Sequence, residues 1–410
     1  MRICFVVQRY GAEVAGGAEQ HCRAFAERLA ARGHGVEVLT SRAVDYLDWA
    51  DHYPAGSHEE NGVLVHRLGV RAPRDLSLFG PLDYRVVGRR PKAPLFLQEE
   101  WLRLQGPEMV GFESWLSANA SRFDVVSFFT YLYLPTALGL RHASPWAPVL
   151  VHPTAHEEPH LRLDLFRLAL AHADGFAYGT AEEAELCRRL FELSRPSEVV
   201  GIGVEPFQGG DAEAFRRRFG LRDRPYLLYL GRVDLHKGVA ELVDFFSTYK
   251  ERHPASDLRL VVAGKEVMRL PEVAGVVKTG YLDGASLRGA LAGALAIVVP
   301  SYFESFSMAL TEAWAAGLPA LVQGRTAVLR GQADRSGGGI AYVGFAEFEA
   351  ALEELEASPG LARALGQAGK RFVESNYAWG AVLDRYEQLI LRVMLRFSSR
   401  ARRGALSRRA

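Results

Sequence analysis

The chain has little cysteine and no long hydrophobic run. Its 410 residues include three cysteines, Cys4, Cys22 and Cys187, and no two of them are closely spaced. This scarcity argues against a disulfide framework or a zinc site and fits a reducing compartment. The longest apolar stretch, ALAGALAIVVP, is far shorter than the roughly 20 residues that cross a bilayer. The N-terminal residues also lack the pattern of a signal peptide. We therefore expect a cytoplasmic protein.

An excess of charge of either sign is missing as well. The 49 lysines and arginines nearly balance the 48 acidic residues, and the formal net charge is +1. The overall charge therefore does not predict a nucleic-acid partner. One local asymmetry remains, because no acidic residue follows Glu387, whereas seven arginines do: Arg392, Arg396, Arg400, Arg402, Arg403, Arg408 and Arg409. This stretch could contact an anionic membrane surface at the inner face of the cell membrane, or form a disordered basic tail.

The distribution of apolar residues predicts an α/β protein. Hydrophobic residues make up 49% and charged residues 24% of the chain, as in globular proteins. Short apolar runs alternate with longer amphipathic ones, and this alternation predicts parallel sheets covered by helices. The predicted strands lie at residues 2–8, 35–40, 63–68, 124–129, 148–152, 175–180, 197–204, 225–232, 258–264, 275–280, 295–301 and 318–323.

The length predicts two domains, since 410 residues exceed one ordinary hydrophobic core. The strand–helix pattern restarts after a glycine-rich stretch, GIGVEPFQGGDAE, which we interpret as a linker. We predict an N-terminal Rossmann-like domain at residues 1–203 and a second one at 204–378. A helix at 379–397 follows, and residues 398–410 form a basic, flexible tail. Ligands of such folds bind beyond the carboxyl ends of the strands.

The spaced G-x-G-x-x-G fingerprint of dinucleotide-binding proteins is absent. In its place, Gly16 and Gly17 follow the first predicted strand and open the first predicted helix. Glycine at that point lets backbone N–H groups approach an anion. A tight turn without a ligand explains the pair equally well.

Two cations follow the first strand of the second domain. In YLGRVDLHKGVAEL, Arg232 and Lys237 both lie between the strand and the next helix. Cations near a helix N-terminus are unfavourable unless they bind an anion, and a diphosphate suits the Arg fork and the Lys point charge. The alternative is a pair of solvated surface cations.

The stretch VVPSYFESFSMALTEAW places two carboxylates around a predicted helix start. We expect the helix to begin near Ser305 or Ser307, with Glu304 just before it and Glu312 about 10 Å further along its axis. The free N–H groups suit a phosphate, and carboxylates accept hydrogen bonds from paired hydroxyls. Otherwise Glu304 merely lies near the N-cap and Glu312 is a solvated helix residue.

One stretch of the first domain, HPTAHEEPHLR, contains side chains of metal-ligand type: His152, His156, Glu157, Glu158 and His160. The spacing differs from the H-E-x-x-H of zinc proteases, because Pro159 interrupts a local helix. We therefore expect that this stretch binds no metal. One of its histidines is expected to contact the substrate, and the other residues have surface or structural roles. The aromatic and basic segment 89–116 could shape an acceptor site, contact a membrane, or simply pack against its domain.

Three motifs in register resemble a known family. GGAE near the start, GRVDLHKG and ESFSMALTE are similar to those of the retaining glycosyltransferases of family 4. The segments VVAG, TGYLD and GLP follow in the same order. The resemblance implies the GT-B fold: two Rossmann-like domains facing a central cleft, with a C-terminal helix crossing back to the N-terminal domain. The nucleotide-sugar donor would bind in the second domain.

The resemblance also implies roles for the matching residues. The implied catalytic residues are Glu304, Arg232, Lys237 and His156, and the implied donor-binding residues are Gly16, Gly17, Gly231, Gly264, Leu282, Ser305, Phe306, Ser307 and Glu312. The family often has glycine where Ser307 stands, and aspartate where Glu157 stands.

The implied reaction is hexosyl transfer to a hydroxyl of a glycan or lipid-linked glycan in cell-envelope synthesis. No D-x-D-like metal pair stands in the matching place, so we expect neither a metal nor another cofactor. Front-face attack would retain the configuration, with the leaving phosphate taking the proton. The alternatives are a nucleotide-sugar 2-epimerase and a non-catalytic relative that binds a nucleotide sugar or glycan.

Overall fold

The computed structural model describes residues 1–88, 92–191 and 194–407, and side chains as far as residue 400. The chain divides into two compact units. Unit 1 comprises Met1–Gly201 and Leu383–Ala410, and unit 2 comprises Ile202–Val382. The division falls within the glycine-rich stretch that the sequence marks as a linker. Part of the predicted basic tail, residues 408–410, lies outside the described residues.

Unit 1 is built on an eight-stranded sheet within these described residues. The strands are β1 (Arg2–Val6), β2 (Gly35–Ser41), β3 (Gly56–Glu60), β4 (Val63–Leu68), β5 (Val125–Phe129), β6 (Val149–His152), β7 (Gly175–Tyr178) and β8 (Ser197–Val199). Their order is β3-β4-β2-β1-β5-β6-β7-β8, and all pairs are parallel except β3 with β4. The sheet is thus parallel as predicted except for β3, a strand that the sequence did not predict. Its sequence, GSHEE, is polar because the strand lies at the sheet edge, and it carries no apolar signal.

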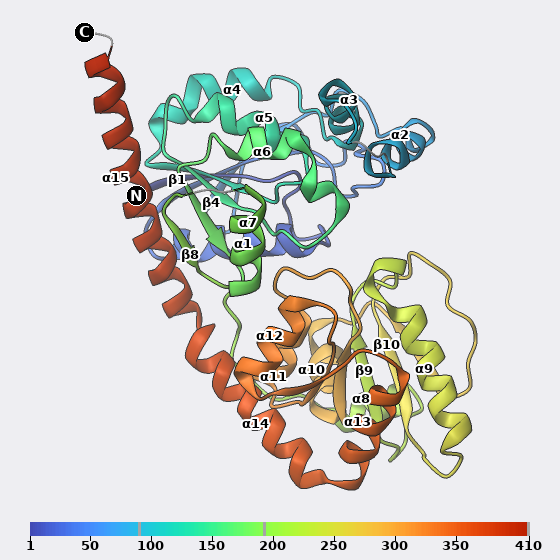
Figure 1. Cartoon of the computed structure of the whole chain (residues 1–410). Coiled ribbons are helices and arrows are strands. Elements are labelled where there is room, and N and C mark those ends of the chain that lie inside the picture. The colour runs from blue at the N-terminus through green and yellow to red at the C-terminus, as the bar shows by residue number, and fades with distance from the viewer. Residues whose placement is uncertain (89–91, 192–193, 408–410) are drawn as a thin grey trace. The chain divides into compact units, whose positions relative to one another are not determined.

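Helices cover both faces of this sheet (Figure 1). They are α1 (Gly17–Ala31), α2 (Leu76–Gly88), α3 (Leu95–Gln105), α4 (Phe112–Asn119), α5 (Leu134–Ala143), α6 (Asp164–Leu170) and α7 (Ala181–Phe191), with short 3-10 turns η1 (Ala120–Arg122) and η2 (Pro159–Arg162). Strand residues alternate between the two faces. On one face, Phe5 and Phe129 pack with Tyr386 of α15 (Trp379–Ser407), and Phe25 of α1 joins them.

The aromatic segment 89–116 packs against its own unit in the residues that can be described. Trp101 of α3 is 1% exposed and Phe112 of α4 is 4% exposed, and both belong to the core on the second face of the sheet. Residues 89–91 lie outside the described part. Of the three readings, packing accounts for the buried side chains of α3 and α4, although Phe96 remains largely exposed.

Unit 2 contains six parallel strands in the described residues. They are β9 (Tyr226–Leu230), β10 (Arg259–Ala263), β11 (Val276–Gly280), β12 (Ala296–Val299), β13 (Ala320–Gln323) and β14 (Gly339–Tyr342). The order is β11-β10-β9-β12-β13-β14, which is the doubly wound arrangement of Rossmann-like folds. The sequence did not predict β14, because GIAY is short and follows a run of glycines.

The helices of unit 2 form a layer on each face of its sheet (Figure 1). They are α8 (Ala212–Arg218), α9 (Val239–Arg252), α10 (Gly284–Gly293), α11 (Met308–Ala315), α12 (Ala327–Ser336), α13 (Phe345–Ala357) and α14 (Pro359–Asn376), with the 3-10 turn η3 (Leu235–Lys237). Alternate residues of β9 enter opposite cores: Leu228 packs with α11 residues, and Leu227 packs with residues of α9 and α13. The apolar run YLLYL is therefore buried on both faces, as expected of a central parallel strand.

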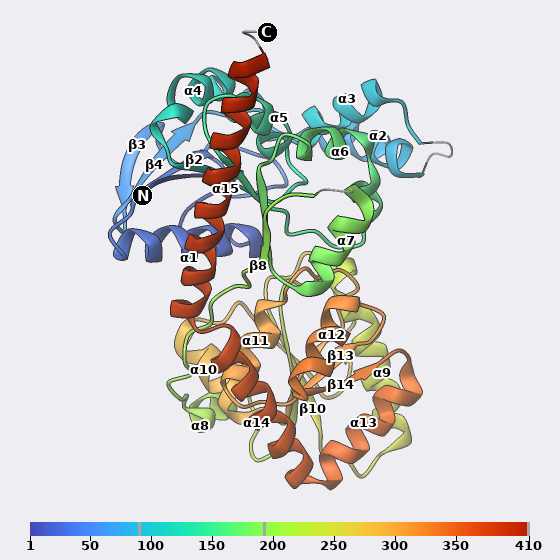
Figure 2. The ribbon, with the colours of Figure 1, turned by 60° about the vertical axis from the view of Figure 1, so that its left-hand side comes forward.

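The chain returns to unit 1 through α15, which runs beside α1 (Figure 2). Tyr386 donates a hydrogen bond to Ser127 of β5, and Arg32 at the end of α1 pairs with Asp384 and Glu387. The helix continues to Ser407, ten residues beyond its predicted end at 397. Arginine is a good helix former, so the tail sequence does not end the helix. None of the helices in the described residues combines the length and the apolar character that a bilayer span needs.

Candidate active site

The predicted residues Gly231, Arg232, Lys237 and Glu304–Ser307 lie at the switch point of the unit 2 sheet. Strands β9 and β12 are neighbours there, and their connections leave in opposite directions along the sheet. The loop 231–238 follows β9 and the loop 300–307 follows β12. In doubly wound sheets this is where ligands bind, so the fold brings these two loops together at the expected edge.

Asp234 organises the first of these loops. Its Oδ2 accepts a hydrogen bond of 2.8 Å from Nε of Arg232, and its Oδ1 accepts one of 3.0 Å from the backbone N–H of Lys237. Asp234 is 8% exposed. One buried carboxylate therefore holds the side chain of Arg232 and the backbone of Lys237. The sequence reasoning did not single it out, although an Asp that precedes a helical turn is a known capping signal.

Lys237 and Glu304 form an ion pair across the two loops. Nζ of Lys237 donates to Oε1 of Glu304 at 2.7 Å, and their side chains are 29% and 13% exposed. The sequence predicted both residues for the site, but it did not predict that they contact each other. Each is therefore held in place by the other at the edge of the sheet.

Close backbone packing keeps the two loops together. A Cβ atom on Gly238 would lie 2.3 Å from the carbonyl oxygen of Pro300, and Gly238 has a left-handed φ of 68°. A Cβ atom on Gly264 would similarly meet the carbonyl oxygen of Gly231 at 1.8 Å. Gly264 and Gly231 therefore have a packing role at this edge, besides any contact with a donor.

Gly238→Ala is expected to destabilise unit 2 by about 2–5 kcal/mol, because alanine is strained at this φ and its Cβ meets backbone that cannot yield. The thermal unfolding midpoint measures this. Gly360→Ala is the matched control, because nothing lies within 4 Å of the added Cβ and the site is helical. Equal midpoints for the two variants would contradict the packing role.

Helix α11 begins at Met308 with Ser307 as its N-cap, which confirms the predicted start. Ser307 has a left-handed φ of 73°, a conformation that glycine adopts without strain. Two hydrogen bonds fix the preceding loop near its two ends. The side chain of Gln332 donates one to the carbonyl of Phe306, and the side chain of Thr326 donates one to the carbonyl of Ser301. The strained serine is thus held by its surroundings.

Glu312 lies in α11, four residues after Met308. Burial raises the pKa of Glu312 to about 7. Within the described residues its carboxylate has no ion-pair partner, unlike Glu304. A half-buried carboxylate of this kind is typical of a functional site.

Two other predicted donor residues are part of the hydrophobic core. Leu282 is 9% exposed and Phe306 is 3% exposed, and both pack in the same cluster of unit 2. The neighbour of Leu282, Tyr281, is 80% exposed. In the segment GYLD, residues 280–283, the side chain that a nucleotide could reach is therefore that of Tyr281, and not that of Leu282.

The glycine pair of unit 1 stands beside a buried ion pair. Glu19, in the first turn of α1, accepts hydrogen bonds from Arg9 and Gln8. A Cβ atom on Gly16 would meet the Glu19 carboxylate at 2.2 Å, whereas nothing lies within 4 Å of one on Gly17. Gly16 therefore makes room for the Glu19–Arg9 pair, and Gly17 leaves the helix start open. The sequence reasoning missed both charged partners.

The histidines of HPTAHEEPHLR have different surroundings. His152 ends β6 inside the aromatic core, where its ring stacks on Phe129. Nδ1 of His156 lies 3.5 Å from Oε1 of Glu158. Glu157 is exposed and pairs with Arg162 and Arg189. The carboxylate beside His156 is therefore that of Glu158, and not that of its neighbour in the sequence.

The backbone just before His156 is anchored by a residue that sequence reasoning missed. The buried carboxylate of Glu183, in α7, accepts hydrogen bonds from the N–H groups of Ala155 and Gly179. Burial raises the pKa of Glu183 to about 7, against the effect of these backbone donors. Glu183 thus joins the loops after β6 and β7.

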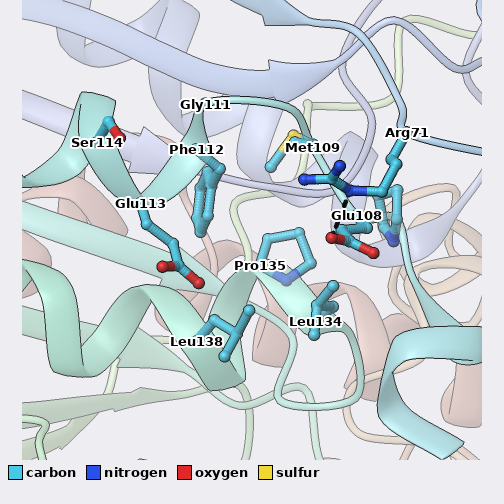
Figure 3. A pocket seen from close by; sticks show the side chains of 11 residues that line it. Arg71, Glu108, Met109, Gly111, Phe112, Glu113, Ser114, Leu134, Pro135 and Leu138 are labelled. Carbon is cyan, nitrogen blue, oxygen red and sulfur yellow. Dashed lines mark hydrogen bonds and ion pairs between the residues drawn. The ribbon is translucent and has the colours of Figure 1, made fainter. Parts of the chain in front are cut away.

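Unit 1 also has a cavity of about 260 Å³ between the start of α5 and the loop before α4 (Figure 3). Phe112, Leu134 and Leu138 contribute apolar side chains to its lining, and the Arg71–Glu108 ion pair also lines it. None of the predicted site residues lines it. Within the described part of the chain, no group of three or more His, Cys, Asp or Glu side chains is arranged to hold a metal ion.

Comparison with known proteins identifies the family. Residues 211–372 match the family model described as glycosyl transferases group 1, and residues 16–203 match the glycosyl transferase 4-like domain. The chain is 25% identical to a glycogen synthase of Mycobacterium tuberculosis, over 95% of this chain and 94% of that protein.

Solved structures give the same fold. The sucrose-phosphate synthase of Thermosynechococcus elongatus superposes with a TM-score of 0.70 at 19% identity, covering 95% of this chain and 98% of that one. The Anabaena protein HepE, solved in complex with UDP-glucose, has a TM-score of 0.65 at 14% identity and covers 95% and 98%. The protein has the GT-B fold and belongs to the family 4 glycosyltransferases, which are retaining enzymes of the hexosyltransferase class that use a nucleotide sugar.

Proposed function

We propose that this enzyme transfers a hexosyl unit from a nucleotide-diphosphate sugar to a hydroxyl of a glycan or lipid-linked glycan of the cell envelope. The observation that supports the donor site most strongly is the Lys237–Glu304 pair at the switch point of the unit 2 sheet. A cation for the diphosphate and a carboxylate for the sugar hydroxyls stand there side by side. The acceptor class rests on analogy with the common use of such enzymes.

Charge development explains the proposed roles of the cations. As the sugar–phosphate bond breaks, negative charge grows on the diphosphate and positive charge grows on the sugar ring. Arg232, Lys237 and the N-terminus of α11 would stabilise the departing diphosphate. Because Lys237 and Arg232 already pair with carboxylates, donor binding would redirect these two cations towards the phosphates.

The proposed transfer needs no metal and no protein nucleophile. The acceptor hydroxyl attacks the anomeric carbon on the face from which the diphosphate leaves, so that the configuration is retained. The new carbon–oxygen bond forms as the carbon–phosphate oxygen bond breaks, and the acceptor proton passes to the leaving phosphate. Glu304 would hold the sugar hydroxyls, Glu312 the ribose hydroxyls, and His156 would contact the sugar from unit 1.

The structure also bears on the proposed peripheral membrane location at the inner face of the cell membrane. Of the seven C-terminal arginines, Arg392 pairs with Glu198 and Arg400 with Asp174. Contact of Arg392 or Arg400 with anionic lipid would therefore compete with these two ion pairs.

The proposed donor site is tested by thermal shift with UDP, GDP, ADP and TDP and their hexose conjugates, without added metal. Binding to the native state raises the midpoint by mass action, and UDP is tried first because HepE was solved with UDP-glucose. We expect one nucleotide to stabilise the wild type and to lose this effect in Arg232→Ala. If none does so, with or without magnesium, the donor proposal is wrong. If the enzyme converts a bound donor in the absence of an acceptor, the result favours an epimerase. If it binds a donor but does not convert it, the result favours a non-catalytic relative.

A further inference from the structure

Three side chains of unit 1 surround the carboxylate of Glu158. The hydroxyl of Tyr131 donates a hydrogen bond to Oε1, Nδ1 of His156 lies 3.5 Å from the same oxygen, and Nδ1 of His160 lies 3.7 Å from Oε2. Tyr131 follows β5, His156 follows β6 and His160 lies in η2. The carboxylate, 16% exposed, therefore connects the loop after β5 with the two histidines on either side of it in residues 156–160.

This carboxylate is ionised despite its burial. Burial raises the pKa of Glu158, but the nearby His160, the charge of His156 and the hydrogen bond from the Tyr131 hydroxyl outweigh it, so that the pKa lies below its usual value. A negative charge therefore faces the His156 ring at neutral pH.

His160 is fixed on its other side by α2 and α3. Its Nε2 lies 2.8 Å from Oδ1 of Asp83, which also accepts a hydrogen bond of 2.7 Å from Nε1 of Trp101. The His160 ring stacks on Trp101 with 5.1 Å between ring centroids. Burial lowers the pKa of His160, but the hydrogen bond to Asp83 and the negative charges of Asp83 and Glu158 outweigh it and raise the pKa to about 9. His160 is therefore a cation that lies between the carboxylates of Asp83 and Glu158.

We propose that Glu158 is the positioning residue of His156, and that Asp83 and Trp101 hold Glu158 in place through His160. The proposal deepens the function proposed above and rests on it, because there His156 contacts the donor sugar. A carboxylate beside Nδ1 keeps the proton on that nitrogen and directs Nε2 away from it. The ring would then meet the sugar in one orientation instead of several.

The adjacent residue provides a matched control. Glu157 has the same side chain, but it is exposed and pairs with Arg162 and Arg189. A comparison of Glu158→Gln with Glu157→Gln therefore separates contact with His156 from a general loss of negative charge in the loop. Both substitutions keep the shape of the side chain.

The first test follows the titration of the His156 ring by NMR, with histidine-labelled protein and assignment by a His156→Gln variant. Removing an opposite charge at this distance disfavours the protonated ring, so the titration midpoint of His156 is expected to fall by about one pH unit in Glu158→Gln. Glu157→Gln is expected to leave it unchanged. An unchanged midpoint in Glu158→Gln would overturn the positioning role, whether or not the protein transfers sugar.

The second test uses kinetics with the donor that the thermal-shift panel identifies. Glu158→Gln is expected to lower kcat by about 10- to 100-fold through loss of the His156 orientation, while the KM for donor and the shift with free nucleotide stay within about twofold of wild type. Glu157→Gln is expected to retain wild-type kcat. Equal kcat in both variants, or a parallel rise in KM, contradicts the proposal. Absence of transfer by the wild type would instead contradict the proposed function.

Discussion

Lys237→Ala is expected to lower kcat by about 10²- to 10³-fold. The cation is proposed to neutralise charge that develops on the diphosphate only as the bond breaks, and the loss of one such group costs about this much in other enzymes. Lys237 also holds Glu304 at 2.7 Å, so its removal frees the carboxylate proposed to bind the sugar. Steady-state kinetics with the identified donor measures the effect.

The control for this prediction is Lys370→Ala in α14, which removes a lysine of the same unit away from the switch point. Its kcat is expected to stay within about twofold of wild type, as is usual for surface substitutions. Circular dichroism and the unfolding midpoint establish that both variants are folded. If Lys237→Ala keeps more than about a tenth of the wild-type kcat, Lys237 does not stabilise the leaving group.

Glu312→Gln is expected to raise stability and to weaken nucleotide binding at the same time. Burial raises the pKa of Glu312 from 4.5 to about 7. Because the folded-state pKa is the higher one, the native protein binds more protons between these values, and its stability falls as the pH rises. Ionised Glu312 thus costs up to about 3 kcal/mol of unfolding free energy, and glutamine removes this cost.

The unfolding midpoint of Glu312→Gln is therefore expected to exceed that of wild type by a few degrees at pH 8, and by much less at pH 5, where the native protein still holds the proton. Nucleotide affinity is expected to behave oppositely. If ionised Glu312 accepts hydrogen bonds from the ribose, wild-type binding tightens as the pH rises through about 7. In Glu312→Gln this additional pH dependence is absent and binding is weaker by about tenfold.

The comparison of wild type with variant removes the contribution of the phosphate itself, which also titrates near this pH. A midpoint difference that does not change with pH would show that Glu312 ionises normally. Unchanged affinity in the variant would show that the ribose binds elsewhere.

Local patterns predicted the fold well where the chain alternates clearly. Runs such as YLLYL and AIVV became the central strands β9 and β12, because parallel strands buried on both faces are apolar throughout. The polar edge strand β3 and the short β14 carried no such pattern. The start of α11 followed from turn chemistry close in sequence, even though Ser307 adopts a left-handed conformation.

The sequence by itself determined the two strand–helix runs. It also determined that the motif residues lie at the carboxyl-terminal edge of each sheet, because periodicity and turn residues act over a few positions. The tertiary structure decided which of those residues touch. Lys237 pairs with Glu304, 67 positions away, and His160 is locked by Asp83, 77 positions away. Glu158, rather than Glu157, faces His156. Such pairings depend on strand order and side-chain direction, which no local pattern encodes, and they set the charge and orientation of the groups proposed to act on the donor.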